Sequence, residues 1–295
     1  MLQDVRAFLI DCEARRLSPT TVERYARELR YFRTWAEQQH VTATPAITPD
    51  LLRRYLLHLA ESRNAGGQHV AYRALRRFLR WYEREYEPRD WRNPMAKVQA
   101  PKLAQEPLPP VSLDDLRAML ATCEARTFRG DRDRAVLLCL LDSGCRASEF
   151  LALNAGDLDL ATGAVHIRHG KGGKARVTFL GARARKALFA YLRHRGALAG
   201  DAPLWVTAEG GRLTYAGLRQ VVRRRALKAG LDKEPSLHSF RRAFAIGALR
   251  AGVDLVSLQR LLGHADLSVI HRYLRQTQDD LQAAHRKGSP VDNLL

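Results

Sequence analysis

Five short segments in the second half of the 295-residue chain carry arginine, lysine, histidine and tyrosine residues whose types suit the cleavage of a phosphodiester bond. Without a metal ion, that reaction requires a nucleophile, an acid for the leaving oxygen, and cations on the non-bridging oxygens, which gain charge in the transition state. The segments that supply such groups are DSGCRASEF (142–150), HGKGGKARVTFL (169–180), LHSFRRAF (237–244), LLGHADLS (261–268) and VIHRYL (269–274).

Each residue type has a chemical property that this reaction uses. The planar guanidinium of arginine binds two phosphate oxygens and stays charged. Histidine transfers a proton near neutral pH, lysine on a short hairpin can protonate a leaving oxygen, and tyrosine can act as a covalent nucleophile. GKGGK lacks the GxxxxGK[ST] spacing of a phosphate loop, so we do not expect ATP binding.

Taken one at a time, the same residues have ordinary structural interpretations. Arg146 can cap a helix or form a salt bridge, and Lys171 can lie in a solvated turn. His238 can make a hydrogen bond at a helix N-terminus, and Tyr273 can be a core aromatic residue. Only the combination of segments, in this order, favours catalysis.

The first hundred residues have the pattern of four helices. The N-terminal residues form an amphipathic pattern and lack the basic start of a signal peptide. Ser18 and Thr48 each precede a proline, which predicts two further helix starts. A turn is expected at 64–67, followed by a fourth helix over 68–86.

Residues 93–110 contain five prolines and no regular hydrophobic period, which is typical of a linker. We therefore predict an N-terminal helical domain over 1–95, a linker over 96–110, and a second domain over 111–295. Two alternating runs around HGKGGK predict a strand–turn–strand in the second domain, and 204–206 has the composition of another short strand. Helices are expected at about 131–143, 182–195, 214–229, 238–251, 254–262, 266–275 and 278–287.

The chain carries a formal net charge of +18, which favours an anionic partner, with nucleic acid as the first candidate. Hydrophobic residues make up 46% of the sequence, so a folded protein carries this charge. Residues 1–106 hold 19 basic and 13 acidic residues, and the remaining 189 hold 30 and 18, so both parts are basic.

No apolar run is long enough for a membrane span. The four cysteines have no zinc-ligand spacing, so no metal site is expected and reduced cytosolic thiols are favoured.

The ordered segments resemble those of the tyrosine recombinase (phage integrase) family. SGCRASEF resembles the first arginine box of the family, GKGGKARVTFL its lysine hairpin, and HSFRRAFA its second arginine box. LLGHADLSVIHRYL resembles the last box, with nine positions from His264 to Tyr273. SPTTVERYARELRYFRTW resembles the four-helix domain that precedes these boxes. The resemblance implies a mainly α fold, with an N-terminal four-helix core-binding (SAM-like) domain and an α-rich catalytic domain that contains a small β-hairpin.

The resemblance implies roles for the residues around the phosphate. Arg146 and Arg241 would hold the scissile phosphate, and His264 would donate a hydrogen bond to it. Glu149 would support Arg146 without taking part in the chemistry. Arg242 stands where the family often has a second histidine, which is expected to change packing and not catalysis.

The resemblance also implies how protons and bonds move. Tyr273 would attack the phosphate and form a 3′-phosphotyrosyl bond, and His238 would assist transfer of its proton. Lys171 would protonate the 5′-oxygen that leaves, with Lys174 as the rival for this role on the same turn. The covalent link conserves the bond energy, so no cofactor, ATP or metal ion would be required.

The expected partner is duplex DNA at a specific site, enclosed by the two domains, with four protomers on two sites. The tetramer would contain this chain alone or with a paralogous recombinase. We favour a cytoplasmic, nucleoid-associated protein with a Xer-like role in resolving chromosome or plasmid multimers. An integrase of a mobile element is the close alternative, and a type IB topoisomerase or a non-catalytic DNA-binding protein are more remote ones. The residues expected to contact DNA are Arg73, Arg76, Arg77, Arg80, Lys174, Arg176 and Arg242.

Overall fold

The computed structural model describes residues 1–103, 109–168 and 175–263, together with positions 282, 285, 286, 289 and 291. The chain divides into two compact units, unit 1 over Met1–Glu106 and unit 2 over Pro107–Leu295, and each is described by itself. Lys171, Lys174, His264 and Tyr273 lie outside the described residues, as do most of the residues of the two helices expected after residue 265.

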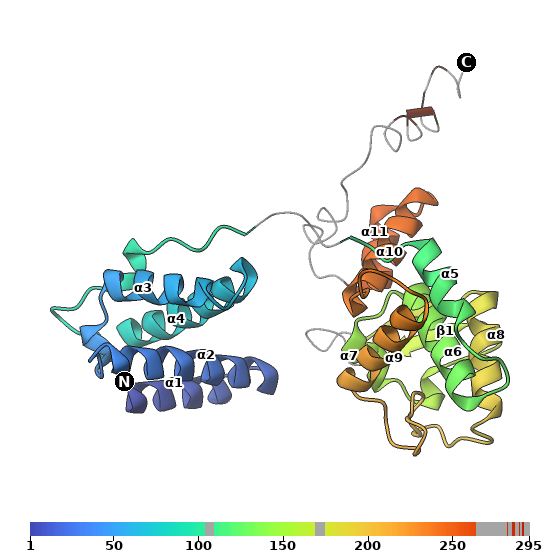
Figure 1. The fold of residues 1–295 in the computed structure, drawn as a ribbon, viewed down its shortest axis with the longest axis horizontal. Coiled ribbons are helices and arrows are strands. Elements are labelled where there is room, and N and C mark those ends of the chain that lie inside the picture. The colour runs from blue at the N-terminus through green and yellow to red at the C-terminus, as the bar shows by residue number, and fades with distance from the viewer. Residues whose placement is uncertain are drawn as a thin grey trace. The chain divides into compact units, whose positions relative to one another are not determined.

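Unit 1 is built from four α-helices, as the sequence predicts (Figure 1). The side chains of Ser18 and Thr48 accept hydrogen bonds from backbone N–H groups of the turns that follow, which confirms two of the expected helix starts. The elements are α1 (Leu2–Ala14), α2 (Pro19–Gln38), the 3-10 helix η1 (Thr44–Ala46), α3 (Pro49–Ala60), α4 (Ala65–Tyr86) and the 3-10 helix η2 (Pro94–Lys97).

The prediction of a turn at 64–67 is wrong, because α4 already begins at Ala65. The side chain of Asn64 accepts a hydrogen bond of 2.9 Å from the N–H of Gly67 and so caps the helix. This cap lets two consecutive glycines occupy the first helical turn, where sequence propensity alone favours a loop.

Aromatic side chains fill much of the core of unit 1. The ring of Phe8 contacts those of Phe78 and Trp81, with centroids 5.7 and 5.6 Å apart. On α4, the residues between those that face this core are exposed arginines. The four of them that were expected to contact DNA are Arg73, Arg76, Arg77 and Arg80.

The segment that follows α4 packs onto unit 1. Met95 and Val98 belong to its buried core. The Tyr72 hydroxyl donates to the Val98 carbonyl at 3.1 Å, and an Arg53 N–H donates to the Lys97 carbonyl at 2.8 Å. The first residues of the stretch expected to be a linker, 96–110, are therefore held by side chains of α3 and α4.

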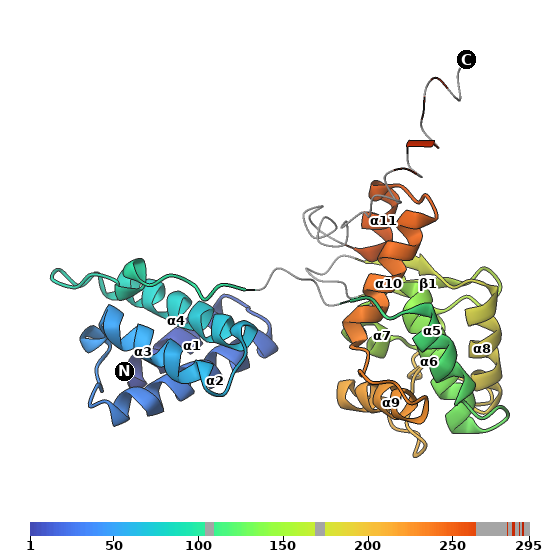
Figure 2. The ribbon, with the colours of Figure 1, turned by 45° about the horizontal axis from the view of Figure 1, so that its top comes forward.

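Unit 2 is organised around the buried helix α6, which contacts α5, α8 and α10 (Figures 1 and 2). Its two strands pair antiparallel, with Ala164 opposite Phe179, and form the small hairpin that was expected. The fold is mainly helical, as predicted. The elements are α5 (Leu113–Ala121), α6 (Phe128–Ser143), α7 (Ala147–Ala152), the 3-10 helix η3 (Ala155–Asp157), β1 (Ala164–Ile167), β2 (Arg176–Phe179), α8 (Ala182–Arg193), α9 (Tyr215–Lys228), α10 (Leu237–Arg250) and α11 (Leu255–Leu262).

The short strand expected at 204–206 is not formed. Residues flanking Trp205 make only isolated bridges, which join Asn154 to Pro203 and Val206 to Arg212. The apolar composition of this segment instead reflects burial, since the Trp205 ring stacks on that of Phe150 at 4.6 Å. No helix of the described segments is long and apolar enough to cross a membrane.

Two glycines with positive φ end the helices that lead into the candidate site. Gly144 ends α6 with φ of 58°, and a Cβ atom there would lie 2.4 Å from the Phe244 ring. Gly263 ends α11 with φ of 64°. Both positions require a left-handed backbone, which glycine adopts without a steric cost.

Candidate active site

The first arginine box forms the N-terminus of α7. Arg146 is the residue that precedes the helix, and its backbone N–H donates to a carboxylate oxygen of Glu149 at 2.9 Å. Nη1 of the same arginine donates to the other carboxylate oxygen of Glu149 at 2.8 Å. About a quarter of the Arg146 side chain remains exposed, at 27%. This guanidinium is therefore held in place and still reachable from solvent.

The second predicted arginine, Arg241, projects from α10 and is almost completely buried, with 1% exposure. Nη1 donates to the Gly144 carbonyl at 2.7 Å, and Nη2 donates to the Leu262 carbonyl at 2.7 Å. Arg241 thereby ties the end of α6 to the end of α11.

The C-terminus of α11 receives hydrogen bonds from three arginines. Its last carbonyl groups have no partner within the helix and carry the negative end of the helix dipole, so they attract cations. Consecutive carbonyls of Leu261, Leu262 and Gly263 accept from Arg176 Nε at 3.0 Å, Arg241 Nη2 at 2.7 Å and Arg146 Nη2 at 3.3 Å. We call Arg146, Arg176 and Arg241, with Glu149, the arginine cluster.

Glu149 is the anion at the centre of this cluster. Its side chain is 3% exposed and accepts hydrogen bonds from Arg176 Nη1 at 3.0 Å and Nη2 at 2.7 Å, in addition to those from Arg146. Burial raises the pKa of the Glu149 carboxyl, but the hydrogen bonds from Arg176 and Arg146 outweigh it and lower the pKa to about 2. Glu149 is therefore ionised throughout the physiological pH range.

His238 lies in the first turn of α10 with an exposed side chain. Partial loss of solvation lowers its pKa, and the positive charges of Arg242, Arg241 and Arg146 lower it further. A histidine in this environment is neutral at pH 7 and has a ring nitrogen available to accept a proton.

The structure thus brings Arg146 and Arg241 onto neighbouring carbonyls at the end of α11, with Glu149 bonded to Arg146, and the charges of both arginines act on His238. The hairpin strands β1 and β2 flank the segment that holds Lys171, and His264 directly follows Gly263 in the sequence. The described residues do not include Lys171, His264 or Tyr273, so their roles stay predictions.

Arg176 differs from the expectation that it contacts DNA. Its side chain is 9% exposed, and Nε, Nη1 and Nη2 all donate to Leu261 or Glu149. This placement makes Arg176 part of the site's internal framework. The segment GKGGKARVTFL gave no sign of this role, because its partners come from distant segments.

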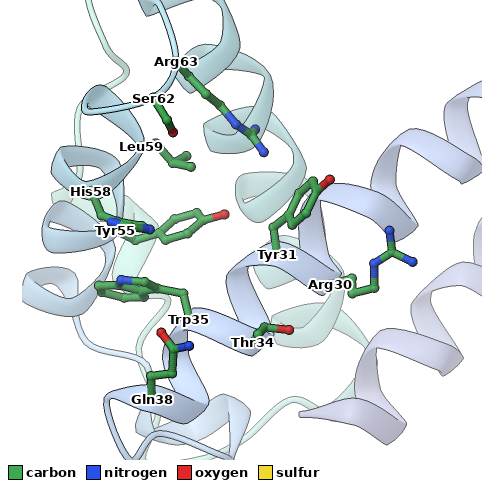
Figure 3. A pocket seen from close by; sticks show the side chains of 10 residues that line it. All are labelled: Arg30, Tyr31, Thr34, Trp35, Gln38, Tyr55, His58, Leu59, Ser62 and Arg63. Carbon is green, nitrogen blue, oxygen red and sulfur yellow. The ribbon is translucent and has the colours of Figure 1, made fainter.

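A separate hollow of about 470 Å³ lies in unit 1 between α2 and α3 (Figure 3). The Arg63 guanidinium points toward it and lies 5.1 Å from the centre of the Tyr31 ring. Arg63 is also paired with the buried carboxylate of Glu28 at 2.6 Å. None of the predicted catalytic residues lines this hollow, so it is not the candidate active site.

Within the described segments, no group of three or more His, Cys, Asp or Glu side chains is arranged to hold a metal ion. The four cysteines are free and buried. Burial raises the thiol pKa values of Cys139 and Cys145, which keeps these thiols protonated and unreactive.

Two families of known proteins match the chain, one in each of its two units. Residues 5–86 match the description "Phage integrase, N-terminal SAM-like domain", and residues 111–279 match "Phage integrase family". The chain is 34% identical to the tyrosine recombinase XerC of Pelobacter propionicus, covering 98% of this chain and 96% of the relative. It is 30% identical to the tyrosine recombinase XerD of Listeria monocytogenes, covering 98% of each.

The fold is similar to that of the Tn1549 transposon integrase in complex with a circular intermediate DNA. The TM-score is 0.76 at 17% identity, and the similarity covers 96% of this chain and 99% of the other. At this identity the likeness concerns the fold alone.

Proposed function

The chain belongs to the phage integrase family of tyrosine recombinases, enzymes that cleave and rejoin DNA, and from this membership we propose a site-specific recombinase that works through a 3′-phosphotyrosyl intermediate. The membership confirms the resemblance seen in the five sequence segments. It also confirms the expected domain types, a SAM-like domain followed by an integrase catalytic domain.

The observation that carries the proposal is the convergence of Arg146 and Arg241 on the end of α11. Both guanidiniums are fixed by backbone carbonyls on elements far apart in the sequence. Donors fixed before the reaction need no reorganisation when charge develops on the phosphate oxygens. We assign Arg146, whose guanidinium remains reachable, to the non-bridging oxygens of the scissile phosphate. Arg241, which is 1% exposed here, is assigned to the same oxygens because it matches the second arginine box of the family, with His264 as a further donor.

In the proposed cleavage step, the Tyr273 hydroxyl oxygen attacks phosphorus and the bond from phosphorus to the 5′-oxygen breaks. The tyrosine proton passes to His238, whose depressed pKa keeps it neutral and able to accept. Lys171 gives a proton to the leaving 5′-oxygen, and Lys174 is the alternative donor. The product is a 3′-phosphotyrosyl bond and a free 5′-hydroxyl.

Rejoining reverses these proton transfers. A 5′-hydroxyl attacks the phosphotyrosyl bond, Tyr273 leaves, and a phosphodiester forms. Strand exchange results when the attacking hydroxyl belongs to the partner duplex. One phosphodiester is made for each one broken, so the balance requires no ATP, cofactor or redox step.

We further propose that the substrate is duplex DNA gripped by two domains, 1–95 and 111–295, with four protomers on two sites. The four exposed arginines of α4 are suited to phosphate contact in the first domain. A cytoplasmic, nucleoid-associated protein suits this role.

Resolution of chromosome or plasmid multimers is favoured because relatives at 30–34% identity over nearly the whole chain are XerC and XerD recombinases. Integration of a mobile element is the second candidate, since residues 111–279 match the phage integrase family.

The central prediction is that Tyr273→Phe abolishes covalent attachment to DNA while DNA binding persists, because only the nucleophilic oxygen is removed. The measurement is adduct formation on a nicked suicide duplex, with band-shift binding as the control. A Tyr273→Phe protein that still forms the adduct shows that another residue is the nucleophile.

Sequencing of the DNA covalently trapped on the wild-type protein in cells would identify the site and supply that duplex. Recovery of one chromosomal or plasmid locus supports the multimer-resolution role, and recovery of element ends supports integration. Relaxation of supercoils without two-site recombination would favour a topoisomerase instead.

A further inference from the structure

Arg176 binds two parts of the site at once. From β2, its Nη1 and Nη2 groups donate to the two carboxylate oxygens of Glu149 at 3.0 and 2.7 Å. Its Nε donates to the Leu261 carbonyl at 3.0 Å. The planar fork of arginine matches a carboxylate in this bidentate arrangement, which lysine cannot reproduce.

The carboxylate of Glu149 is shared evenly between two arginines. One oxygen accepts from Nη1 of Arg146 at 2.8 Å and from Nη1 of Arg176, and the other accepts from the Arg146 backbone at 2.9 Å and from Nη2 of Arg176. Each arginine therefore constrains both oxygens. Loss of Arg176 would remove half of these four hydrogen bonds, and Glu149 would then be oriented only by Arg146, the residue that it is meant to hold.

The backbone of α11 leaves little freedom at this contact. A Cβ atom at position 263 would lie 2.8 to 3.0 Å from three side-chain atoms of Arg176. The glycine at the end of α11 thus permits the close approach that places Arg176 between the helix end and Glu149. In the sequence, the same strand follows the segment that contains Lys171.

We propose that Arg176 is a positioning residue for DNA cleavage, acting through Glu149 to fix the Arg146 guanidinium, and that it does not contact DNA. The proposal rests on the proposed function. It deepens that function by adding to the phosphate-binding machinery a residue that never touches the phosphate. It also replaces the sequence-based expectation that Arg176 binds the duplex.

The main test is a double-mutant cycle on the rate of adduct formation in a single turnover with saturating DNA. Because a small displacement of a catalytic group costs up to about 100-fold, Arg176→Met should slow cleavage by about 10- to 100-fold. Glu149→Gln should slow it similarly. In the Glu149→Gln background, Arg176→Met should add less than about twofold, since the two residues act as one unit. Independent, multiplicative losses overturn the proposal.

Arg176→Lys separates charge from geometry. Lysine keeps the cation but not the fork, so this variant should remain slow in cleavage. The salt test uses Arg176→Met, which removes the cation: its DNA affinity and the slope of that affinity with salt should match the wild type, since loss of one phosphate contact would change the slope by about 0.9. A reduced slope shows direct DNA contact and overturns the proposal.

Arg225→Lys is the matched control. Arg225 is also largely buried, with 3% exposure against 9% for Arg176; it donates one hydrogen bond to Asp133 and one to the Thr122 carbonyl, and it lies outside the arginine cluster. Both lysine variants should lower the melting temperature, but only Arg176→Lys should slow cleavage by folded protein. Equal cleavage rates in the two variants show a merely structural role for Arg176.

A second readout needs no cleavage. The groups that face the Glu149 carboxyl are Arg146 and Arg176, with the Cys145 thiol and Arg241 nearby. In protein labelled with ¹³C at glutamate carboxyls, Arg176→Met should raise the titration midpoint of the signal that Glu149→Gln removes. An unchanged midpoint overturns the proposal even when the wild type cleaves. Absence of any wild-type adduct overturns the proposed function, and this role with it.

Discussion

Unit 2 contains two buried carboxylates bridged by arginines, and only one of them belongs to the candidate active site. Asp133 on α6 is fully buried and accepts hydrogen bonds from Arg132, Arg224 and Arg225 at 2.8 to 3.1 Å. Glu149 on α7 is held as tightly by Arg146 and Arg176. Neither the number of ion pairs nor the depth of burial distinguishes a site from a structural cluster.

The two clusters differ in the titratable groups that lie near their arginines. Around Asp133, the charge of Arg225 acts on the buried thiol of Cys123, whose pKa is raised by desolvation. Around Glu149, the charges of Arg146 and Arg241 act on His238, which is exposed and able to exchange a proton. A cluster of arginines becomes a candidate for phosphate chemistry when a group that transfers protons lies within its field.

The largest expected difference between the two clusters is in the effect of removing a guanidinium on the cleavage rate. Arg241→Lys should lower the single-turnover cleavage rate about 100- to 1,000-fold, because removal of one preorganised donor to a developing oxyanion has a cost of this size. Adduct formation on the suicide duplex measures the effect, and a thermal melt confirms folding. A folded Arg241→Lys protein that cleaves at the wild-type rate would remove Arg241 from the chemistry.

The opposite result is expected at Asp133. Asp133→Asn leaves three arginines around a neutral group and should lower the free energy of unfolding by about 3 to 5 kcal/mol, as when one partner of a buried ion pair is removed. Denaturant unfolding measures this loss. At a temperature where the variant is folded, its cleavage rate should equal that of the wild type, and a slower rate would mean that the two clusters are coupled.

The smallest effect concerns the proton acceptor. Removing a neighbouring positive charge in Arg242→Gln should raise the His238 pKa toward its ordinary value, since cations disfavour the protonated ring. The neutral form then persists only at higher pH, so the acid limb of the cleavage profile should move to higher pH. Lys233→Gln, which removes an exposed charge before α10, is the control. If the acid limb of the pH profile does not move, His238 is not the residue that accepts the proton.

Local sequence signals predicted the helices well where a single residue decides the boundary. Ser18, Thr48 and Gly144 each mark a helix end that the structure confirms. The error at 64–67 arose because two glycines favoured a loop, whereas the Asn64 cap favoured a helix start. Such competition between local preferences is decided by tertiary packing of α4, which the sequence window does not contain.

Strand β2 shows why the site could be predicted only in part. Its apolar residues Val177 and Phe179 are exposed, and the alternate residues Arg176 and Thr178 face inward. The inward polar groups are satisfied by distant partners: Thr178 donates to the Ser143 carbonyl at 2.9 Å, as Arg176 does to Glu149. The order of the five segments identified the chemistry, but the direction of each side chain depended on contacts between them.

The shared end of α11 has a consequence for how the sequence can vary. Successive residues of a helix are rotated by about 100°, so inserting or deleting one residue within α11 would turn Leu261, Leu262 and Gly263 away from all three arginines together. Substitutions on the outer face of α11, such as at the exposed Val256, leave these backbone carbonyls in place. Among homologues, α11 should therefore tolerate many changes of residue type and almost none of length.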